Sequence, residues 1–192
     1  MQPAKEYHRR PMPTVGDADP TTLYAAVGLA TSRWQMVEFT LSQLFSTFMN
    51  RHATGAVSFH SYPALEAYAA IIGFKTRTSV LRKAAGVFFR LNGFDDLQPP
   101  FKSAVDRADN FSPRRNDIAH GIVLRREEND KNLRFFLETS FESRGTGHKA
   151  TYSLTSREVG YFTDRFVECQ DELQELVYTI RARCRASPPK YE

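Results

Sequence analysis

The chain of 192 residues is long enough for one domain with a buried core. Apolar residues make up 41% of it and charged residues 25%, which is typical of a globular protein, and a formal charge of +4 is compatible with an anionic partner without requiring one. No apolar run approaches the roughly 18 residues of a membrane helix, and the first residues lack the apolar core of a signal peptide, so we expect a cytoplasmic protein with no membrane partner. Two cysteines make no disulfide framework, and no zinc spacing, P-loop or GxGxxG is present, so we expect no structural metal and no cofactor.

The first 20 residues contain four prolines and few apolar side chains, which predicts a flexible arm. His8, Arg9 and Arg10 in it could contact nucleic acid, although a solvated tail is the simpler interpretation. From about Pro20 to about Arg51, apolar residues recur at alternating steps of four and three and predict a long amphipathic helix: Leu23, Val27, Ala30, Trp34, Val37, Leu41, Leu44 and Phe48. Glu38 lies beside this seam, either as a surface residue or as the buried partner of a cation.

The middle of the chain predicts two further helical stretches. The first runs from about Pro63 to Leu91, with a break or kink at Gly73 and an apolar set that includes Val80, Leu81, Ala84, Val87, Phe88 and Leu91. Its basic residues Lys75, Arg77, Arg82, Lys83 and Arg90 predict a solvated face. After a break at residues 92–100, Phe101, Val105 and Ala108 predict a third helix, which we expect Pro113 to interrupt. A short segment then restarts with Ser112 as N-cap and stops at Gly121.

From Ile122 the apolar period changes to that of strands. Residues 122–127 and 133–139 predict a hairpin around the polar turn 128–132, and residues 150–154 predict a third short strand. Thr155 and Glu158 form a capping-box pattern that opens a last helix, whose seam is Val159, Phe162, Phe166, Cys169, Leu173, Leu176, Ile180 and Cys184. The expected fold is all-α: an antiparallel four-helix bundle with a small β-hairpin inserted before the last helix. The arm spans residues 1–20, one helical domain spans 21–185, and 186–192 form a frayed tail.

The stretch SPRRNDIAHG, residues 112–121, carries residue types that suit RNA cleavage. The planar fork of Arg115 matches phosphate oxygens and stays charged. His120 can move a proton near neutral pH, and the Asn116 amide can donate to a phosphoryl oxygen or hold the histidine. The spacing of Arg115 and His120 carries little weight by itself, because arginine is frequent in this chain. A second interpretation therefore stays open, in which the stretch is the capped, solvated end of a helix.

The same residues resemble a known family. RRNDIAHG is similar to the R-N-x-x-x-H signature of the HEPN superfamily (higher eukaryotes and prokaryotes nucleotide-binding domains), and the resemblance in helix order extends over residues 20 to 185. It implies a helical bundle, usually dimeric, in which two motifs meet and form a metal-independent endoribonuclease. Arg115 would bind the scissile phosphate, Asn116 would orient the phosphate or the histidine, and His120 would be the acid–base residue. Arg114 and Asp117 are supporting candidates in the motif.

By analogy with an acidic residue on the first helix of some relatives, Glu38 would hold Arg115 in place. One histidine per motif also favours a homodimer, because cleavage needs both an acid and a base. The resemblance implies RNA as substrate and a toxin, defence or stress-response role, with an antitoxin or regulatory protein as a further partner. Ile122 stands where toxin members regulated by adenylylation carry a tyrosine, so that regulation is not expected. The alternative is a non-catalytic nucleotide-binding or protein-interaction module on the same bundle.

Overall fold

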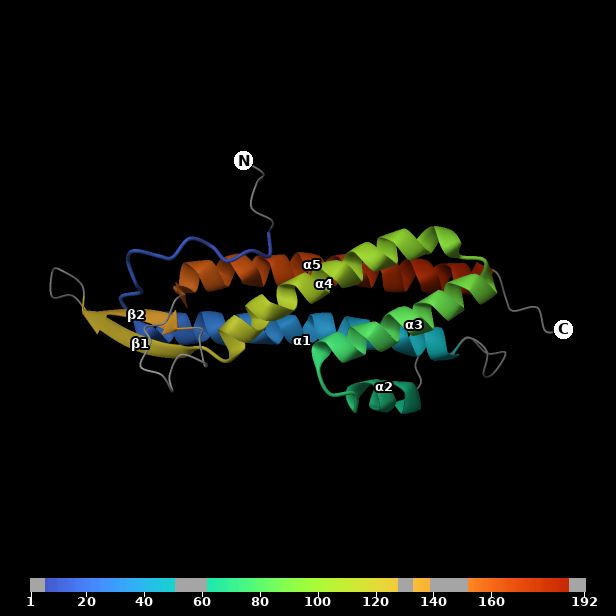
Figure 1. The fold of residues 1–192 in the computed structure, drawn as a ribbon, viewed down its shortest axis with the longest axis horizontal. Coiled ribbons are helices and arrows are strands. Elements are labelled where there is room, and N and C mark those ends of the chain that lie inside the picture. Colours follow the sequence, from blue (N-terminus) through green and yellow to red (C-terminus); the bar gives the residue numbers. More distant parts are fainter. Residues whose placement is uncertain (1–5, 51–61, 128–132, 139–151, 187–192) are drawn as a thin grey trace. The chain divides into compact units, whose positions relative to one another are not determined.

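The computed structural model describes residues 6–50, 62–127, 133–138 and 152–186. These residues are mostly helical and include one small antiparallel sheet (Figure 1). None of the described helices is long and apolar enough to cross a membrane. The chain divides into two compact units, which we call the sheet unit (Met1–Gln35 with Asn110–Val167) and the helical unit (Met36–Asp109 with Glu168–Glu192).

The first and last helices begin and bury their seams as their sequences predict. Helix α1 spans Pro20–Asn50, and its N-cap is Asp19, whose carboxylate accepts the Thr21 N–H at 3.0 Å. Helix α5 spans Ser156–Ala186, and the Thr155 N–H donates to the Glu158 carboxylate at 3.0 Å, as the capping-box pattern predicts. Every residue of the α5 seam is buried, including both free cysteines, and all of the α1 seam is buried except the half-buried Val27. The two seam predictions are therefore confirmed.

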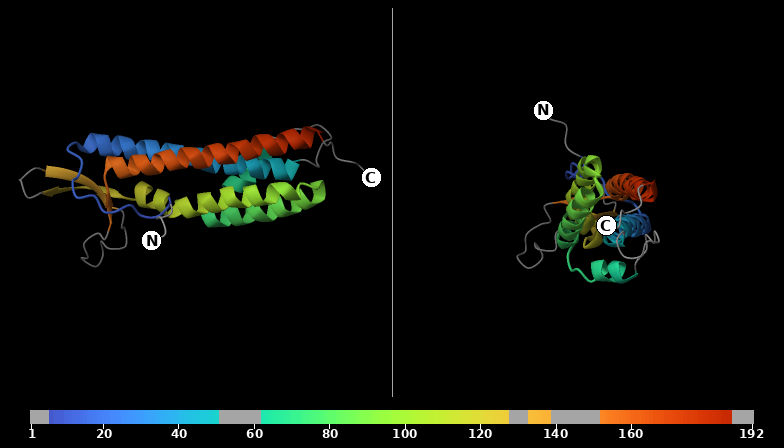
Figure 2. Two further views of the ribbon diagram at one scale, coloured as in Figure 1. Left: turned by 90° about the horizontal axis from the view of Figure 1, so that it is seen from above. Right: turned by 90° about the vertical axis from the view of Figure 1, so that its right-hand side faces the viewer.

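The sheet unit contains the predicted hairpin. Strands β1 (Ile122–Glu127) and β2 (Leu133–Glu138) pair antiparallel, and β3 (Ser153–Leu154) pairs with the other edge of β2. The turn predicted at residues 128–132 lies outside the described residues. Asp17 of the N-terminal segment exchanges backbone hydrogen bonds with Phe135 at 3.0 and 2.9 Å, and Figure 2 shows that segment, in dark blue, passing beside the strands before α1 begins.

The core of the sheet unit is aromatic and aliphatic. Phe166 of α5 makes edge-to-face contacts with Trp34 of α1 at 5.1 Å and with Phe111 of helix α4 (Gln98–Ala119) at 5.8 Å between ring centroids. The strands add Leu137 and Leu154, which are paired across β2 and β3 and fully buried. These contacts fix the last turns of α4 beside the sheet, and α4 carries the predicted motif.

The helical unit is built around phenylalanine. Phe48 of α1 contacts the rings of Phe88, Phe89 and Phe101 at centroid distances of 4.9, 5.5 and 5.6 Å. Helix α2 (Tyr62–Ala69) and helix α3 (Phe74–Asn92) are separated at Gly73, whose φ of 85° ends the helical path and confirms the predicted break. A short 3-10 helix, η1 (Asp95–Leu97), precedes α4. Figure 2 shows α2 set off from the longer helices of this unit.

The apolar and basic faces predicted for α3 are partly wrong. Thr78, Leu81, Ala85, Phe88 and Phe89 are the buried residues, whereas the predicted core residues Val87 and Leu91 are 48% and 62% exposed. The basic face is not simply solvated either. Arg82 lies 2.7 Å from carboxylate oxygens of both Asp106 and Asp109 on α4. The apolar prediction fails in part because α3 has more apolar residues than fit on its single buried face, so some of them remain exposed.

Helix α4 is continuous through Pro113, which corrects the predicted interruption. Ser112 is buried inside the helix and is not an N-cap. Pro113 lacks the N–H that would bond to the carbonyl of Asp109, so the helix loses one hydrogen bond there. Phe111 and Ile118 are buried on either side of the proline, and their packing is sufficient to keep the helix in one piece.

Candidate functional site

The predicted motif occupies the last turns of α4, where the helix meets the sheet. Helix α4 ends at Ala119, and the N–H of His120 still donates to the carbonyl of Asn116 at 3.0 Å. His120 therefore follows Asn116 by one helical turn on the same face, and both side chains are exposed. The Arg115 guanidinium donates through Nη1 to Oδ1 of Asn116 at 3.0 Å. That bond leaves the Asn116 NH₂ group as a donor toward solvent on the face that carries His120.

Arg114 and Asp117 lie one turn apart on another face of the same helix. Their side chains are only 13% and 14% exposed, and Nη1 of Arg114 is 2.9 Å from Oδ2 of Asp117. These two atoms are close but not aligned for a hydrogen bond, so the attraction is mainly between charges. Arg9 of the N-terminal segment contacts the same carboxylate at 3.6 Å. Burial raises the pKa of Asp117 above its usual value, although Arg114 and Arg9 act in the opposite direction.

The N-terminal segment brings two further arginines onto two tyrosine rings of the sheet unit. The Arg9 guanidinium lies over the ring of Tyr152 at 4.7 Å, and the Arg10 guanidinium lies over the ring of Tyr161 at 4.3 Å. The backbone N–H of Arg10 donates to the hydroxyl of the buried Tyr152 at 3.1 Å. Residues 6–19, which the sequence predicts as part of a flexible arm, thus make specific contacts with α4, α5 and the sheet.

Gly121 connects the motif to β1, and its backbone lies very close to the side chain of Leu137 on β2. A Cβ on this residue would lie 2.7 Å from Cγ and Cδ1 of Leu137 and 2.9 Å from the Asp117 carbonyl oxygen. The φ of Gly121 is not positive, so the glycine is required here for space and not for a left-handed turn. The sequence predicts the helix to stop at this glycine, and α4 does end just before it, but the reason is packing against the sheet.

Glu38 belongs to the helical unit, where its carboxylate accepts Nη1 of Arg77 at 2.7 Å. The same guanidinium donates to the carbonyls of Ile71 and Ala69 at 2.8 and 3.2 Å, so this ion pair holds the end of α2. Arg115 belongs to the sheet unit, and the role of Glu38 as its partner stays a prediction.

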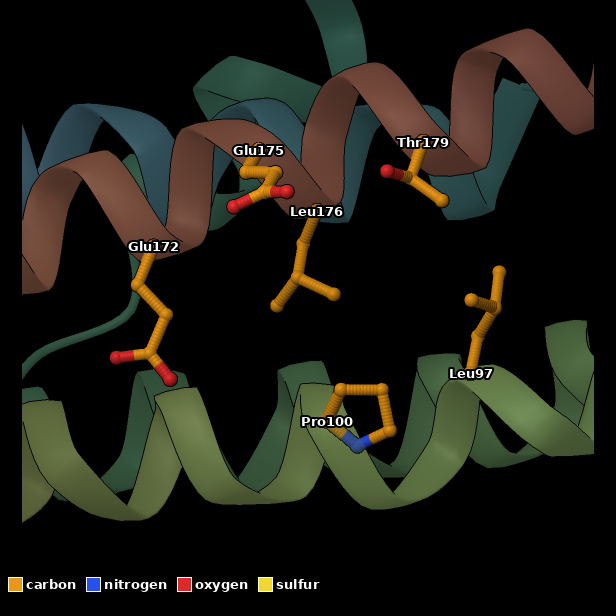
Figure 3. A pocket seen from close by; sticks show the side chains of 6 residues that line it. All are labelled: Leu97, Pro100, Glu172, Glu175, Leu176 and Thr179. Carbon is orange, nitrogen blue, oxygen red and sulfur yellow. The ribbon is translucent and has the colours of Figure 1, made fainter.

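A separate pocket of about 270 Å³ lies in the helical unit (Figure 3). Its apolar floor is formed by the side chains of Leu97, Pro100 and Leu176, and its polar groups are Glu172, Glu175 and Thr179. Two carboxylates repel a phosphate, and none of the motif residues lines this pocket. Among the described residues, no group of three or more His, Cys, Asp or Glu side chains could hold a metal ion.

Comparisons of the chain with protein families, with curated proteins and with solved structures gave no match. The functional interpretation therefore depends on the residues themselves. The sequence predicts a solvated tail, or a contact with nucleic acid, for Arg9 and Arg10, and no motif in it marks Tyr152 or Tyr161. Their partners lie more than 100 positions away in the chain, so local pattern gives no signal for these contacts.

Proposed function

We propose that this chain is a metal-independent endoribonuclease of the HEPN type, in which the long helices α1, α3, α4 and α5 form a four-helix bundle. The observation that carries the proposal is the last turn of α4. It presents Asn116 on the same exposed face as His120, which directly follows the helix, and the half-buried Arg115 is hydrogen-bonded to Asn116. A fixed cation, an amide donor and an imidazole within two helical turns are suited to phosphate chemistry.

The reaction that suits these groups is attack of a ribose 2′-hydroxyl on the adjacent phosphate. A neutral imidazole removes the 2′-hydroxyl proton, the new P–O bond forms, and the bond to the 5′-oxygen breaks. An imidazolium donates a proton to that oxygen, so the products are a 2′,3′-cyclic phosphate and a 5′-hydroxyl. Arg115 and the Asn116 NH₂ group stabilise the charge that develops on the phosphoryl oxygens.

This reaction uses two imidazoles, and each motif provides one. A two-fold axis through the motif would supply His120 twice, which favours a homodimer with the site at its interface. Within the described residues the other histidine is His8, which is exposed and precedes Arg9 in the sheet unit. His8 therefore serves as a matched control for His120.

The first experiment incubates purified protein with RNA in EDTA and identifies the product ends. We expect cleavage with cyclic phosphate ends, and a fall of about 100-fold or more in the rate for His120→Ala and for Arg115→Ala. His8→Ala and Arg33→Ala, which change an exposed histidine and an exposed arginine of the same unit, should cleave like the wild type. Full activity of both motif variants would refute the proposal, and RNA binding without cleavage by the wild type would favour the alternative, a binding module.

A second experiment tests the dimeric arrangement. Wild-type and His120→Ala chains are mixed at equal amounts, unfolded and refolded together, so that subunits combine at random. If each site needs His120 from both subunits, the activity per subunit pair falls to about one quarter of that of pure wild type. A fall to about one half would contradict the two-histidine site, and loss of activity in His8→Ala would point to a proton pair within one chain.

A further inference from the structure

The N-terminal segment places cations beside the motif with few carboxylates to neutralise them. Arg9 and Arg114 both contact Asp117, so two guanidinium groups share one carboxylate. Arg10 has no carboxylate within ion-pair distance among the described residues, and Arg165 of α5 lies near the same ring of Tyr161, at 5.5 Å. The guanidinium groups of Arg9, Arg10 and Arg114 thus gather near a single contacting carboxylate, that of Asp117.

The two arginines of the segment are held in a form that can bind a phosphate. A guanidinium stacked on a tyrosine ring uses its face for that contact and keeps its edge N–H groups for an acceptor. The hydrogen bond from the Arg10 N–H to Tyr152 fixes the backbone between the two stacked side chains. Both side chains remain accessible, with Arg9 48% exposed and Arg10 also exposed. Less rotamer entropy is lost on binding when a side chain is already positioned.

The segment also lies close to the motif along α4. Asp117, which Arg9 contacts, follows Asn116 directly and precedes His120 by three residues, which is less than one helical turn of about 5.4 Å. An RNA strand bound at Arg115 and His120 would therefore have neighbouring phosphates within reach of the segment.

We propose that Arg9 and Arg10 form a second phosphate-binding subsite, which binds the backbone of single-stranded RNA next to the scissile phosphate. This inference rests on the proposed function, because it names the groups that hold the same substrate. Asp117 keeps Arg9 beside the motif when RNA is absent, and a phosphate replaces that weak contact at 3.6 Å.

The test measures binding of a labelled single-stranded RNA of about 12 nucleotides by fluorescence anisotropy, at several salt concentrations. All proteins carry His120→Ala, so that the probe stays intact. For single-stranded nucleic acid, each phosphate contact contributes about 0.7 to the slope of log Kd against log salt. We expect Arg9→Ala/Arg10→Ala to lower the slope by about 1.4. The loss of affinity between about 50 and 200 mM salt then becomes about sevenfold smaller.

Two variants separate RNA binding from a purely structural role. Arg33→Ala/Lys83→Ala removes two exposed positive charges elsewhere and should leave the slope unchanged. Arg9→Lys/Arg10→Lys keeps the charges but loses the planar stacking, so the slope should persist while the melting temperature falls. An unchanged slope in the double alanine variant, or an equal fall in the control, would overturn the inference.

The two proposals fail separately. Cleavage by the wild-type chain with an unchanged slope in Arg9→Ala/Arg10→Ala would remove the second subsite and leave the ribonuclease. A reduced slope without any cleavage by the wild type would keep the subsite on a protein that binds RNA and does not cut it.

Discussion

Gly121 offers the sharpest test of how the motif is held, because a single methyl group should disturb it. In Gly121→Ala the new Cβ would lie 2.7 Å from two side-chain carbons of Leu137 and 2.9 Å from the Asp117 carbonyl oxygen. Carbon atoms in favourable contact are about 3.5–4.0 Å apart, so the overlap is roughly 1 Å. Leu137 is 1% exposed and belongs to the central strand of the sheet, so it has little freedom to move away.

The expected cost follows from two opposing terms. Forcing an extra methyl group into a packed site destabilises a protein by about 1–3 kcal/mol. Replacing glycine by alanine stabilises by about 0.4–1 kcal/mol through the unfolded chain. The free energy of unfolding of Gly121→Ala should therefore fall by about 1–2 kcal/mol, which corresponds to a melting temperature lower by about 2–8 °C for a chain of this size.

Gly160→Ala is the matched control. Gly160 lies inside α5 in the same unit, and a Cβ there would meet no atom within 4 Å. The same substitution should raise the free energy of unfolding by about 0.5–1 kcal/mol. Urea unfolding monitored by circular dichroism measures both variants, with the slope m as a check that the unfolded states are comparable.

A double-mutant cycle with Leu137→Ala identifies the clash. Shortening Leu137 should relieve most of the overlap, so Gly121→Ala should cost at least about 0.5 kcal/mol less in the Leu137→Ala background than in the wild type. A Gly121→Ala protein as stable as the wild type, or an equal loss of stability in both backgrounds, would show that the predicted clash with Leu137 does not occur.

Two further perturbations test the neighbouring ion pairs. Arg77→Lys keeps a charge for Glu38 but loses hydrogen bonds to the end of α2, so hydrogen exchange of Tyr62–Ala69 should become about 10-fold faster, with α3 unchanged; equal exchange in α2 would contradict this. Asp117 has a raised pKa, so its stabilising contribution is full below the unfolded pKa of about 3.9 and is lost as pH rises through the folded pKa. The melting temperature of Asp117→Asn should therefore rise relative to that of the wild type as the pH is raised through that window. A constant difference between the two melting temperatures from about pH 3 to pH 7 would show that the pKa of Asp117 is not raised by folding.

The long helices and the hairpin could be predicted because their signals are local and periodic. In α1 and α5 the apolar residues recur every three or four positions over the whole helix, and burial of one stripe then follows directly. Strands β1 and β2 follow one another around a polar turn, so their pairing also needs only neighbouring sequence.

The continuity of α4 could not be predicted in this way. Ser112 and Pro113 are a strong local signal for a helix start, and the signal is overridden by packing of Phe111 and Ile118 in the core. Phe111 packs against Phe166, which lies 55 residues further along the chain. A local pattern cannot weigh that burial against one missing hydrogen bond.

In the candidate site, too, the residue types could be predicted from the sequence, whereas their arrangement could not. The residue types of Arg115, Asn116 and His120 were evident from the sequence, but their arrangement was not, because Arg115 and His120 point about 140° apart on an ideal helix. The structure places His120 one turn after Asn116 and gives Arg115 a bond to the Asn116 amide. The amide therefore connects the cation to the face that carries the imidazole.

The residues that stabilise this end of α4 differ from those proposed to act on RNA. Asp117 and Gly121 face Arg114, Arg9 and the sheet, and these contacts fix the helix end. His120 is exposed, and no hydrogen bond or ion pair joins its side chain to another described residue. His120→Ala should therefore change the free energy of unfolding by no more than about 0.5 kcal/mol, whereas changes at Gly121 should be costly. If a His120→Ala protein unfolds like the wild type but no longer cleaves RNA, the lost activity is due to the missing imidazole. The contacts that hold the end of α4 are unchanged in that protein.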